Sequence, residues 1–219
     1  AAYWRGMRFE RPAVRILANW AQGADRFFDM GANFGFFSYW LLSCQPNIQV
    51  DAFDPLPVNV EFMMRTRDRN GLAQRFEVNA CALGDAREKC ALHVGTTNLG
   101  HSTLAPHPGL GEHTLEVSVL PFDEWRQQSG IPWPSQPRWV AKIDVEGFEV
   151  RVLKGMQEAL TRRVFKGLMI EINTFTLNLM GARPEDIYSI LEGWGYVAQT
   201  APKRRRVSEE ICYNAFFEP

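Results

Sequence analysis

The chain has 219 residues and a formal net charge of -1 at pH 7, from 24 Lys and Arg against 25 Asp and Glu. This length suits one α/β domain with a sizeable core and is short for two domains of ordinary size, so we expect a single domain over residues 1–219. The balanced charge excludes a general electrostatic attraction to nucleic acid or to an anionic membrane.

A few local features refine this description. The basic run KRRR at residues 203–206 is interpreted as a solvated turn, with a contact to phosphate or to an acidic substrate as the alternative. No uninterrupted apolar run approaches the length of a membrane-spanning helix, and the N-terminus lacks a signal-peptide pattern. The four cysteines form no C-x-x-C pair, which argues against a zinc site or a disulfide framework. We therefore expect a cytoplasmic protein with reduced thiols.

Residues 1–25 are predicted to be an N-terminal helical segment. Apolar residues recur on one face over residues 12–22, and Gly23 ends the pattern. The next stretch, RFFDMGANFGFFSYW at residues 26–40, predicts a short buried strand, a tight glycine turn and a helix. This order is typical of half of a nucleotide-binding βαβ unit.

The glycine turn is the first candidate ligand site. Glycine lets the backbone take positive φ and lets a ligand lie against it, and the helix start directs free N–H groups into the same space. The spacing differs from the dinucleotide fingerprint G-x-G-x-x-G, and its acidic residue suits a ligand with an amino group better than one with two phosphates. An ordinary glycine turn before a helix is the alternative. The candidate contacts are Asp29, Gly31, Asn33 and Gly35.

A second strand, IQVDAF at residues 48–53, ends at Asp54. An acidic residue about 20 residues beyond a glycine turn can accept hydrogen bonds from both hydroxyls of a ribose. Asp54 is therefore a second candidate for ligand binding. A helix is then predicted from Pro57 to the Asn70-Gly71 stop signal.

A third strand is predicted over residues 76–83, FEVNACAL, and it is closed by Gly84. Because loops at this edge of a doubly wound sheet face the ligand, three of its residues are candidates for an adenine pocket. They are Asn79, Ala82 and Leu83.

The pattern changes over residues 90–120, where two short strands flank a stretch rich in glycine, threonine, histidine and proline. We interpret this region as an inserted hairpin or flap. The histidines of this stretch are spaced by six residues, which fits no metal-ligand pattern. His101, beside Ser102 and Thr103, is kept as a candidate substrate contact or base.

The second informative stretch is WVAKIDVEGFE at residues 139–149, which predicts a buried strand ending in Asp144, a turn at Glu146-Gly147 and a helix over residues 148–160. Further elements are predicted after it. They are a strand at 168–172 that carries Glu171 and leads to Asn173, a helix at 184–194, and strands at 196–200 and 212–217. The connection before the last strand is too short for a helix, so this strand is expected to run antiparallel.

Three motifs together resemble the FkbM family of class I S-adenosylmethionine-dependent methyltransferases. They are D-x-G-x-N-x-G at residues 29–35, ALGD at 82–85 and KIDVEG at 142–147. The resemblance covers residues 27–173. It implies an α/β fold with a doubly wound, Rossmann-like seven-stranded sheet, S-adenosyl-L-methionine as donor, and O-methylation of a sugar or natural product.

The resemblance also implies roles for individual residues. It places the four motif residues of the glycine turn around the methionine part of the donor, Asp54 on the donor ribose, and Asp144 nearest the transferable methyl. One departure is that Asp54 stands where the family commonly has glutamate, which shortens the arm toward the ribose.

The chemistry requires a base as well as a donor site. Methyl transfer needs an acceptor oxygen held in line and a group that removes its proton. The candidates are Asp144 first, then Glu146, Glu171 and His101, with salt bridges or strand-end caps as the equal alternative for Glu146 and Glu171. A Mg²⁺ ion on Asp144, Glu171 and Asn173 is a less favoured alternative, so we predict no metal site.

The leading hypothesis is therefore an O-methyltransferase with a small-molecule acceptor and no nucleic-acid or membrane partner. N-methylation of a peptide or amine and a non-catalytic S-adenosylmethionine-binding module are the rival hypotheses. An NAD-dependent reductase is disfavoured, because no third glycine follows Gly35 at the required spacing. The sequence contains no pattern that identifies the acceptor or the oligomeric state.

Overall fold

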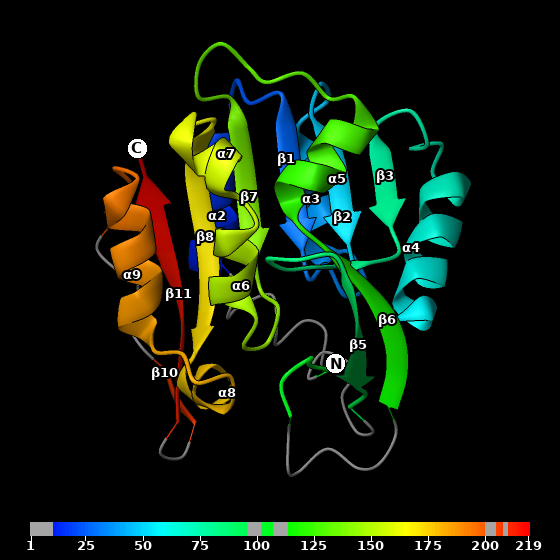
Figure 1. Ribbon diagram of the computed structural model, residues 1–219. Coiled ribbons are helices and arrows are strands. Elements are labelled where there is room, and N and C mark those ends of the chain that lie inside the picture. The colour runs from blue at the N-terminus through cyan, green and yellow to red at the C-terminus, as the bar shows by residue number, and fades with distance from the viewer. Residues whose placement is uncertain (1–10, 96–101, 107–113, 200–204, 208–209) are drawn as a thin grey trace.

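A mostly parallel β-sheet forms the centre of the molecule (Figure 1). The computed structural model describes residues 11–95, 102–106, 114–199, 205–207 and 210–219. Across the sheet the strand order is β10-β11-β8-β7-β1-β2-β3, and the short β9 pairs with β11. The strands are β1 (Arg26–Met30), β2 (Gln49–Phe53), β3 (Phe76–Asn79), β7 (Trp139–Ile143), β8 (Phe165–Asn173), β9 (Val197–Ala198), β10 (Arg205–Val207) and β11 (Glu210–Glu218).

Neighbouring strands from β3 to β8 run parallel, whereas β11 runs antiparallel to β8. The predicted Rossmann-like sheet with an antiparallel last strand is therefore confirmed. Because β1 pairs with both β2 and β7, the carboxyl ends of these three strands lie next to one another. This edge is where ligands bind in doubly wound sheets.

Helices cover both faces of the sheet (Figure 1). One face packs against α2 (Arg11–Ala21), α3 (Phe36–Cys44) and α4 (Pro57–Arg69), and the other against α5 (Phe122–Ser129), α6 (Glu149–Lys154), α7 (Gln157–Thr161) and α9 (Pro184–Gly193). A short helix that the sequence did not predict, α8 (Thr174–Leu179), follows the end of β8. None of the helices in the described ranges has the length and apolar character required to cross a bilayer.

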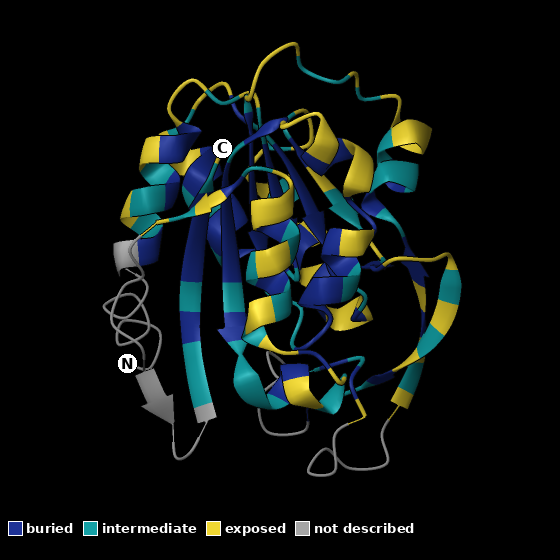
Figure 2. Ribbon diagram, turned by 60° about the vertical axis from the view of Figure 1, so that its left-hand side comes forward, coloured by how far each residue is buried: buried dark blue, intermediate teal, exposed yellow. Residues whose placement is uncertain are grey.

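Alternation along β1 fills both cores, because successive side chains of a strand point to opposite faces. Phe27 packs with the α2 and α3 core, whereas Phe28 packs with the core under α5 to α7. The Phe28 ring makes edge contacts with Phe122 and Trp139, each with a centroid separation of 5.0 Å. The dark blue strands between helices with yellow outer surfaces in Figure 2 show the same layering. Both cores therefore hold β1, the central strand, in place.

A second, smaller sheet stands beside the first. It contains β4 (Ala82–Leu83), β5 (Glu88–His93) and β6 (Thr114–Leu120) in the order β4-β6-β5. The β5 and β6 strands pair antiparallel, which confirms the predicted inserted hairpin, and β4 pairs parallel with β6.

Three predicted elements need correction. The single strand predicted over 76–83 divides into β3 and β4, because Ala82 and Leu83 pair with β6. The helix predicted over 148–160 is interrupted at Gly155, where a Cβ would lie only 1.9 Å from the carbonyl oxygen of Gly84. The turn predicted at 203–206 is wrong for Arg205 and Arg206, which belong to β10 and pair with β11.

Phe28→Ala is expected to lower the free energy of unfolding by about 3–5 kcal/mol, because it removes a fully buried ring from the centre of the larger core. Urea unfolding followed by circular dichroism measures the change. Val197→Ala is the control, since Val197 is 61% exposed and its truncation should change stability by less than about 0.5 kcal/mol. A loss below about 1 kcal/mol for Phe28→Ala would contradict this packing.

Candidate functional site

A cavity lies at the carboxyl ends of β1, β2 and β7, with the inserted sheet on its other side. Its empty volume is about 690 Å³ when the open mouth is included. Seven predicted site residues line it. They are Gly31, Asn33, Asp54, Ala82, Leu83, Asp144 and Glu146. The inserted region contributes Leu92, Ser102 and Leu104 to the opposite wall.

Gly31 brings the ends of three strands together. Its φ is 78°, and a Cβ on it would lie 1.8 Å from the carbonyl oxygen of Asp144, so no side chain fits at this position. The backbone N–H groups of Gly31 and Ala32 donate to the carbonyl oxygen of Phe53 at 3.0 and 2.9 Å. The glycine therefore lets β1 approach β7 closely while its turn is tied to β2.

Asp29 and Gly35 lie behind the cavity wall. Asp29 is completely buried, and its Oδ2 accepts hydrogen bonds from the Ser38 N–H at 3.2 Å and the Ser38 hydroxyl at 2.7 Å. Burial raises the pKa of Asp29, although the nearby Lys142 ammonium opposes the rise. Gly35 has φ 79°, and a Cβ on it would lie 3.1 Å from the Tyr39 ring and 3.2 Å from the Met63 side chain on α4. Asp29 thus fixes the first turn of α3 to the end of β1. For Asp29 and Gly35, a direct contact with a ligand stays a prediction.

Asp54 lies at the cavity surface and is 6% exposed. Its carboxylate accepts hydrogen bonds from the backbone N–H groups of Asn33, at 2.8 Å, and Leu56, at 2.9 Å, and from the Asn59 side chain at 3.1 Å. Burial raises the pKa of Asp54 to about 6, against the effect of these donors. The donors fix the carboxylate at the end of β2, where the sequence places a ribose contact.

The predicted adenine-pocket residues separate into two groups. Ala82 and Leu83 line the cavity as part of β4. Asn79 does not line it, because its amide donates to the Ala52 carbonyl oxygen at 3.2 Å and its Oδ1 accepts from the Trp125 indole at 2.9 Å. The Asn79 side chain therefore joins β3 to β2 and α5.

A buried lysine lies beneath the cavity floor. The Lys142 Nζ is 2.9 Å from Asp144 Oδ2, 3.2 Å from the Gly31 carbonyl oxygen and 3.7 Å from Asp29 Oδ1. Burial would lower the pKa of Lys142, but the charges of Asp144 and Asp29 outweigh it and raise the pKa above its ordinary value. Lys142 therefore stays charged and holds one oxygen of Asp144 toward the floor.

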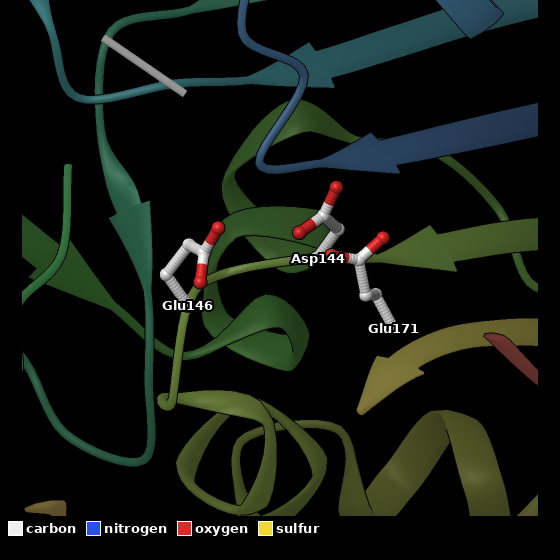
Figure 3. Close-up of side chains that lie close together, drawn as sticks. All are labelled: Asp144, Glu146 and Glu171. Carbon is white, nitrogen blue, oxygen red and sulfur yellow. The ribbon is translucent and has the colours of Figure 1, made fainter. Parts of the chain in front are cut away.

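Three carboxylates lie close together, of which Asp144 and Glu146 line the cavity and Glu171 does not. Asp144, Glu146 and Glu171 each place an oxygen within 4.8 Å of the others (Figure 3). Burial raises the pKa of Glu146 above its ordinary value, and the charges of Asp144 and Glu171 add to the rise. Glu146 therefore keeps its proton at a higher pH than an exposed glutamate does.

These carboxylates include two of the three residues considered for Mg²⁺. The third, Asn173, uses its side-chain oxygen to accept from the Phe175 N–H at 3.1 Å and so caps α8. Carboxylates this close together also occur without an ion. Their arrangement fits shared protons as well as it fits a bound metal ion. His101 lies outside the described residues.

Three residues that support the site were not predicted from the sequence. Asn59, on the first turn of α4, donates a hydrogen bond to Asp54. An amide five residues after the acid could have indicated this contact. Glu149 accepts hydrogen bonds from the backbone N–H groups of Val145 and Gly147. An acid at the start of the helix after the turn could have indicated these contacts. Thr103 donates to the Glu146 carbonyl oxygen from far away in the sequence, and no local pattern indicated it.

Comparison with known proteins shows the family of this chain. The sequence profile of the methyltransferase FkbM domain matches residues 29–198. The chain belongs to the FkbM methyltransferase family. It is therefore a methyltransferase, and S-adenosylmethionine is its methyl donor.

Two similar methyltransferases have names that state what they act on. The hexuronic acid methyltransferase AglP of Haloferax volcanii is 26% identical over 190 residues, which cover 85% of this chain and 70% of AglP. The 31-O-demethyl-FK506 methyltransferase FkbM of Streptomyces tacrolimicus is 28% identical over 209 residues, which cover 81% of this chain and 75% of that protein.

Solved structures confirm the methyltransferase fold. A putative sarcosine dimethylglycine methyltransferase from Galdieria sulphuraria has a TM-score of 0.56 and 12% identity, over 97% of this chain and 85% of its own. The Streptococcus pneumoniae protein Sp1610, a putative tRNA methyltransferase solved with S-adenosyl-L-methionine, has a TM-score of 0.53 and 10% identity, over 94% and 72% of the two chains.

Donor affinity is expected to fall at acid pH through Asp54. Burial raises the pKa of Asp54 to about 6, so the carboxylate that is predicted to accept hydrogen bonds from the ribose hydroxyls is lost as the pH falls through this value. We expect the Kd for S-adenosylmethionine to rise about fivefold between pH 6 and pH 5, measured by calorimetry.

Asp54→Asn is the matched control for this prediction. It should bind the donor weakly at every pH, and its Kd should not change between pH 6 and pH 5. This result distinguishes Asp54 from Glu149, another buried acid, whose pKa is raised by burial to about 7. Identical pH profiles for the two proteins would show that another group controls donor binding.

Proposed function

We propose that this FkbM methyltransferase transfers the methyl group of S-adenosylmethionine to a hydroxyl of a small molecule, either a sugar or a natural product. The observation that carries the proposal is the cavity itself, which is lined by Asp54, a buried carboxylate suited to ribose, and by Asp144 and Glu146, two members of the carboxylate group. The names of the two relatives, a hexuronic acid methyltransferase and a 31-O-demethyl-FK506 methyltransferase, favour acceptors of this kind.

The donor half of the cavity fits a nucleoside. Asp54 would accept hydrogen bonds from the ribose hydroxyls, and apolar side chains such as Phe53 and Leu83 would pack against the adenine. The turn at Gly31 and Asn33 would surround the methionine part, with Asp29 and Gly35 supporting that turn from behind. S-adenosylmethionine supplies a methyl group that is already activated for transfer.

The acceptor half of the cavity must orient a hydroxyl and remove its proton. Asp144 is the first candidate base, because its side chain is 27% exposed at the cavity and Lys142 holds one of its oxygens in place. Glu146 and Glu171 lie close enough to receive or share the proton. The wall formed by Ser102 and Leu104 would contact the rest of the acceptor.

Domain organisation, location and partners follow the expectations from the sequence. Residues 1–219 are treated as one methyltransferase domain, of which residues 29–198 match the family profile. The four cysteines are unpaired, which is consistent with a reducing cytoplasm. The only partner proposed is the small-molecule acceptor, with no nucleic acid and no membrane.

Turnover with a panel of acceptors tests the function. S-adenosylhomocysteine release is measured with hexuronic acids, neutral sugars, hydroxylated macrolides and, as the rival class, peptides and amines. We expect release with a hydroxyl acceptor and a new O-methyl signal in the product NMR spectrum. Methylation of nitrogen in the product, or release with peptides and amines alone, would contradict O-methylation.

Asp144→Asn tests the proposed base with the acceptor found in that panel. The amide keeps the shape but cannot take a proton, so kcat should fall by about 10²–10⁴-fold. The Kd for S-adenosylmethionine should change far less. Asp25→Asn is the control, since Asp25 pairs with Arg138 on the surface, away from the cavity lining. If Asp144→Asn retained wild-type kcat, the base would have to be another group.

EDTA is expected to leave turnover unchanged, in line with the predicted absence of a metal site. The measurement compares initial rates before and after dialysis against EDTA, and again after Mg²⁺ is added back. A loss of activity that Mg²⁺ restores would overturn this expectation and would make Asp144, Glu146 and Glu171 the candidate ligands.

A further inference from the structure

Glu146 has a backbone conformation that residues with side chains rarely adopt. Its φ is 50°, and the next residue, Gly147, has φ 103°. A residue other than glycine persists in the left-handed region only where surrounding contacts fix it. In this conformation the Glu146 carboxylate points toward Asp144 and Glu171 (Figure 3). The contacts that fix the turn therefore decide where this carboxylate lies.

Two contacts hold the turn from the side of α6 and α8. Glu149 is 2% exposed, and its Oε1 accepts hydrogen bonds from the backbone N–H groups of Val145 and Gly147 at 3.2 and 3.1 Å. A Cβ on Gly147 would lie 2.6 Å from the Thr176 carbonyl oxygen, so the turn lies directly against α8. Neither of these two contacts involves the carbonyl group of Glu146, which accepts its hydrogen bond from another part of the chain.

That third contact comes from the inserted region. The Thr103 hydroxyl donates to the carbonyl oxygen of Glu146 and accepts from the Ala105 N–H at 2.9 Å. Thr103 is 1% exposed, and its backbone exchanges hydrogen bonds of 3.0 and 2.8 Å with His93 at the end of β5. One hydroxyl therefore joins the inserted sheet to the turn that follows β7.

The residues on either side of Thr103 face the cavity. Ser102 and Leu104 line the wall opposite the strand ends, and Glu146 lines the same cavity. We propose that Thr103 is a positioning residue, which locks the Glu146 turn to this wall so that the carboxylates and the acceptor-side wall keep one fixed spacing. The proposal rests on the proposed function, which assigns this wall to the acceptor.

Thr103→Val tests the proposal, because valine keeps the shape of threonine and removes the hydroxyl. We expect kcat to fall by about tenfold with the KM for S-adenosylmethionine changed by less than about twofold. Thr103→Ser restores the hydroxyl and should recover most of the lost kcat. The matched control is Thr161→Val, since the exposed Thr161, the last residue of α7, donates its hydroxyl to the Gln157 carbonyl oxygen at 2.6 Å.

Backbone hydrogen exchange of residues 145–147 gives a second measurement that needs no acceptor. Exchange should be faster in Thr103→Val and unchanged in Thr103→Ser and Thr161→Val. Wild-type kcat in Thr103→Val, or unchanged exchange in that variant, overturns the inference. If the wild-type protein turns over no acceptor, the proposed function fails instead, and exchange alone then decides whether Thr103 holds the turn.

Discussion

The close approach of Gly31 to Asp144 is the constraint on which the rest of the site depends. A side chain at residue 31 would overlap the Asp144 carbonyl oxygen, so the ends of β1 and β7 can meet only because this residue is glycine. Their meeting places the donor turn, tied to β2 through Phe53, beside the carboxylate that follows β7. The donor half and the reactive half of the cavity are therefore built from neighbouring strand ends.

Charge balance is the second constraint. Lys142 is the buried cation between Asp29, Asp144 and the Gly31 carbonyl group, and replacing it would leave Asp29 buried without a compensating charge. On the cavity side of Asp144, burial and the charges of Asp144 and Glu171 favour protonation of Glu146. Asp144 therefore lies between Lys142, which balances its charge on one side, and the carboxylates of Glu146 and Glu171 on the other. An acceptor hydroxyl would approach Asp144 from the side of these carboxylates.

Local sequence patterns predicted much of the fold and part of the site. The strand-turn-helix around Gly31, the acid after β2 and the acid after β7 could be predicted, because each combines a buried strand with an acidic residue within one position of the strand's end. Asn79, β10 and Thr103 were not readable, because their positions depend on partners distant in sequence: Trp125, β11 and the Glu146 turn. Patterns of spacing identify strand ends, whereas tertiary contacts decide which side chains at those ends face the cavity.

The central claim is that the cavity at the ends of β1, β2 and β7 binds the donor nucleoside. A crystal structure of the protein with S-adenosylhomocysteine tests it most directly. The account predicts the ribose hydroxyls within hydrogen-bond distance of Asp54 and the sulfur atom facing Asp144. A nucleoside bound elsewhere, or bound in this cavity with its ribose away from Asp54, would contradict it.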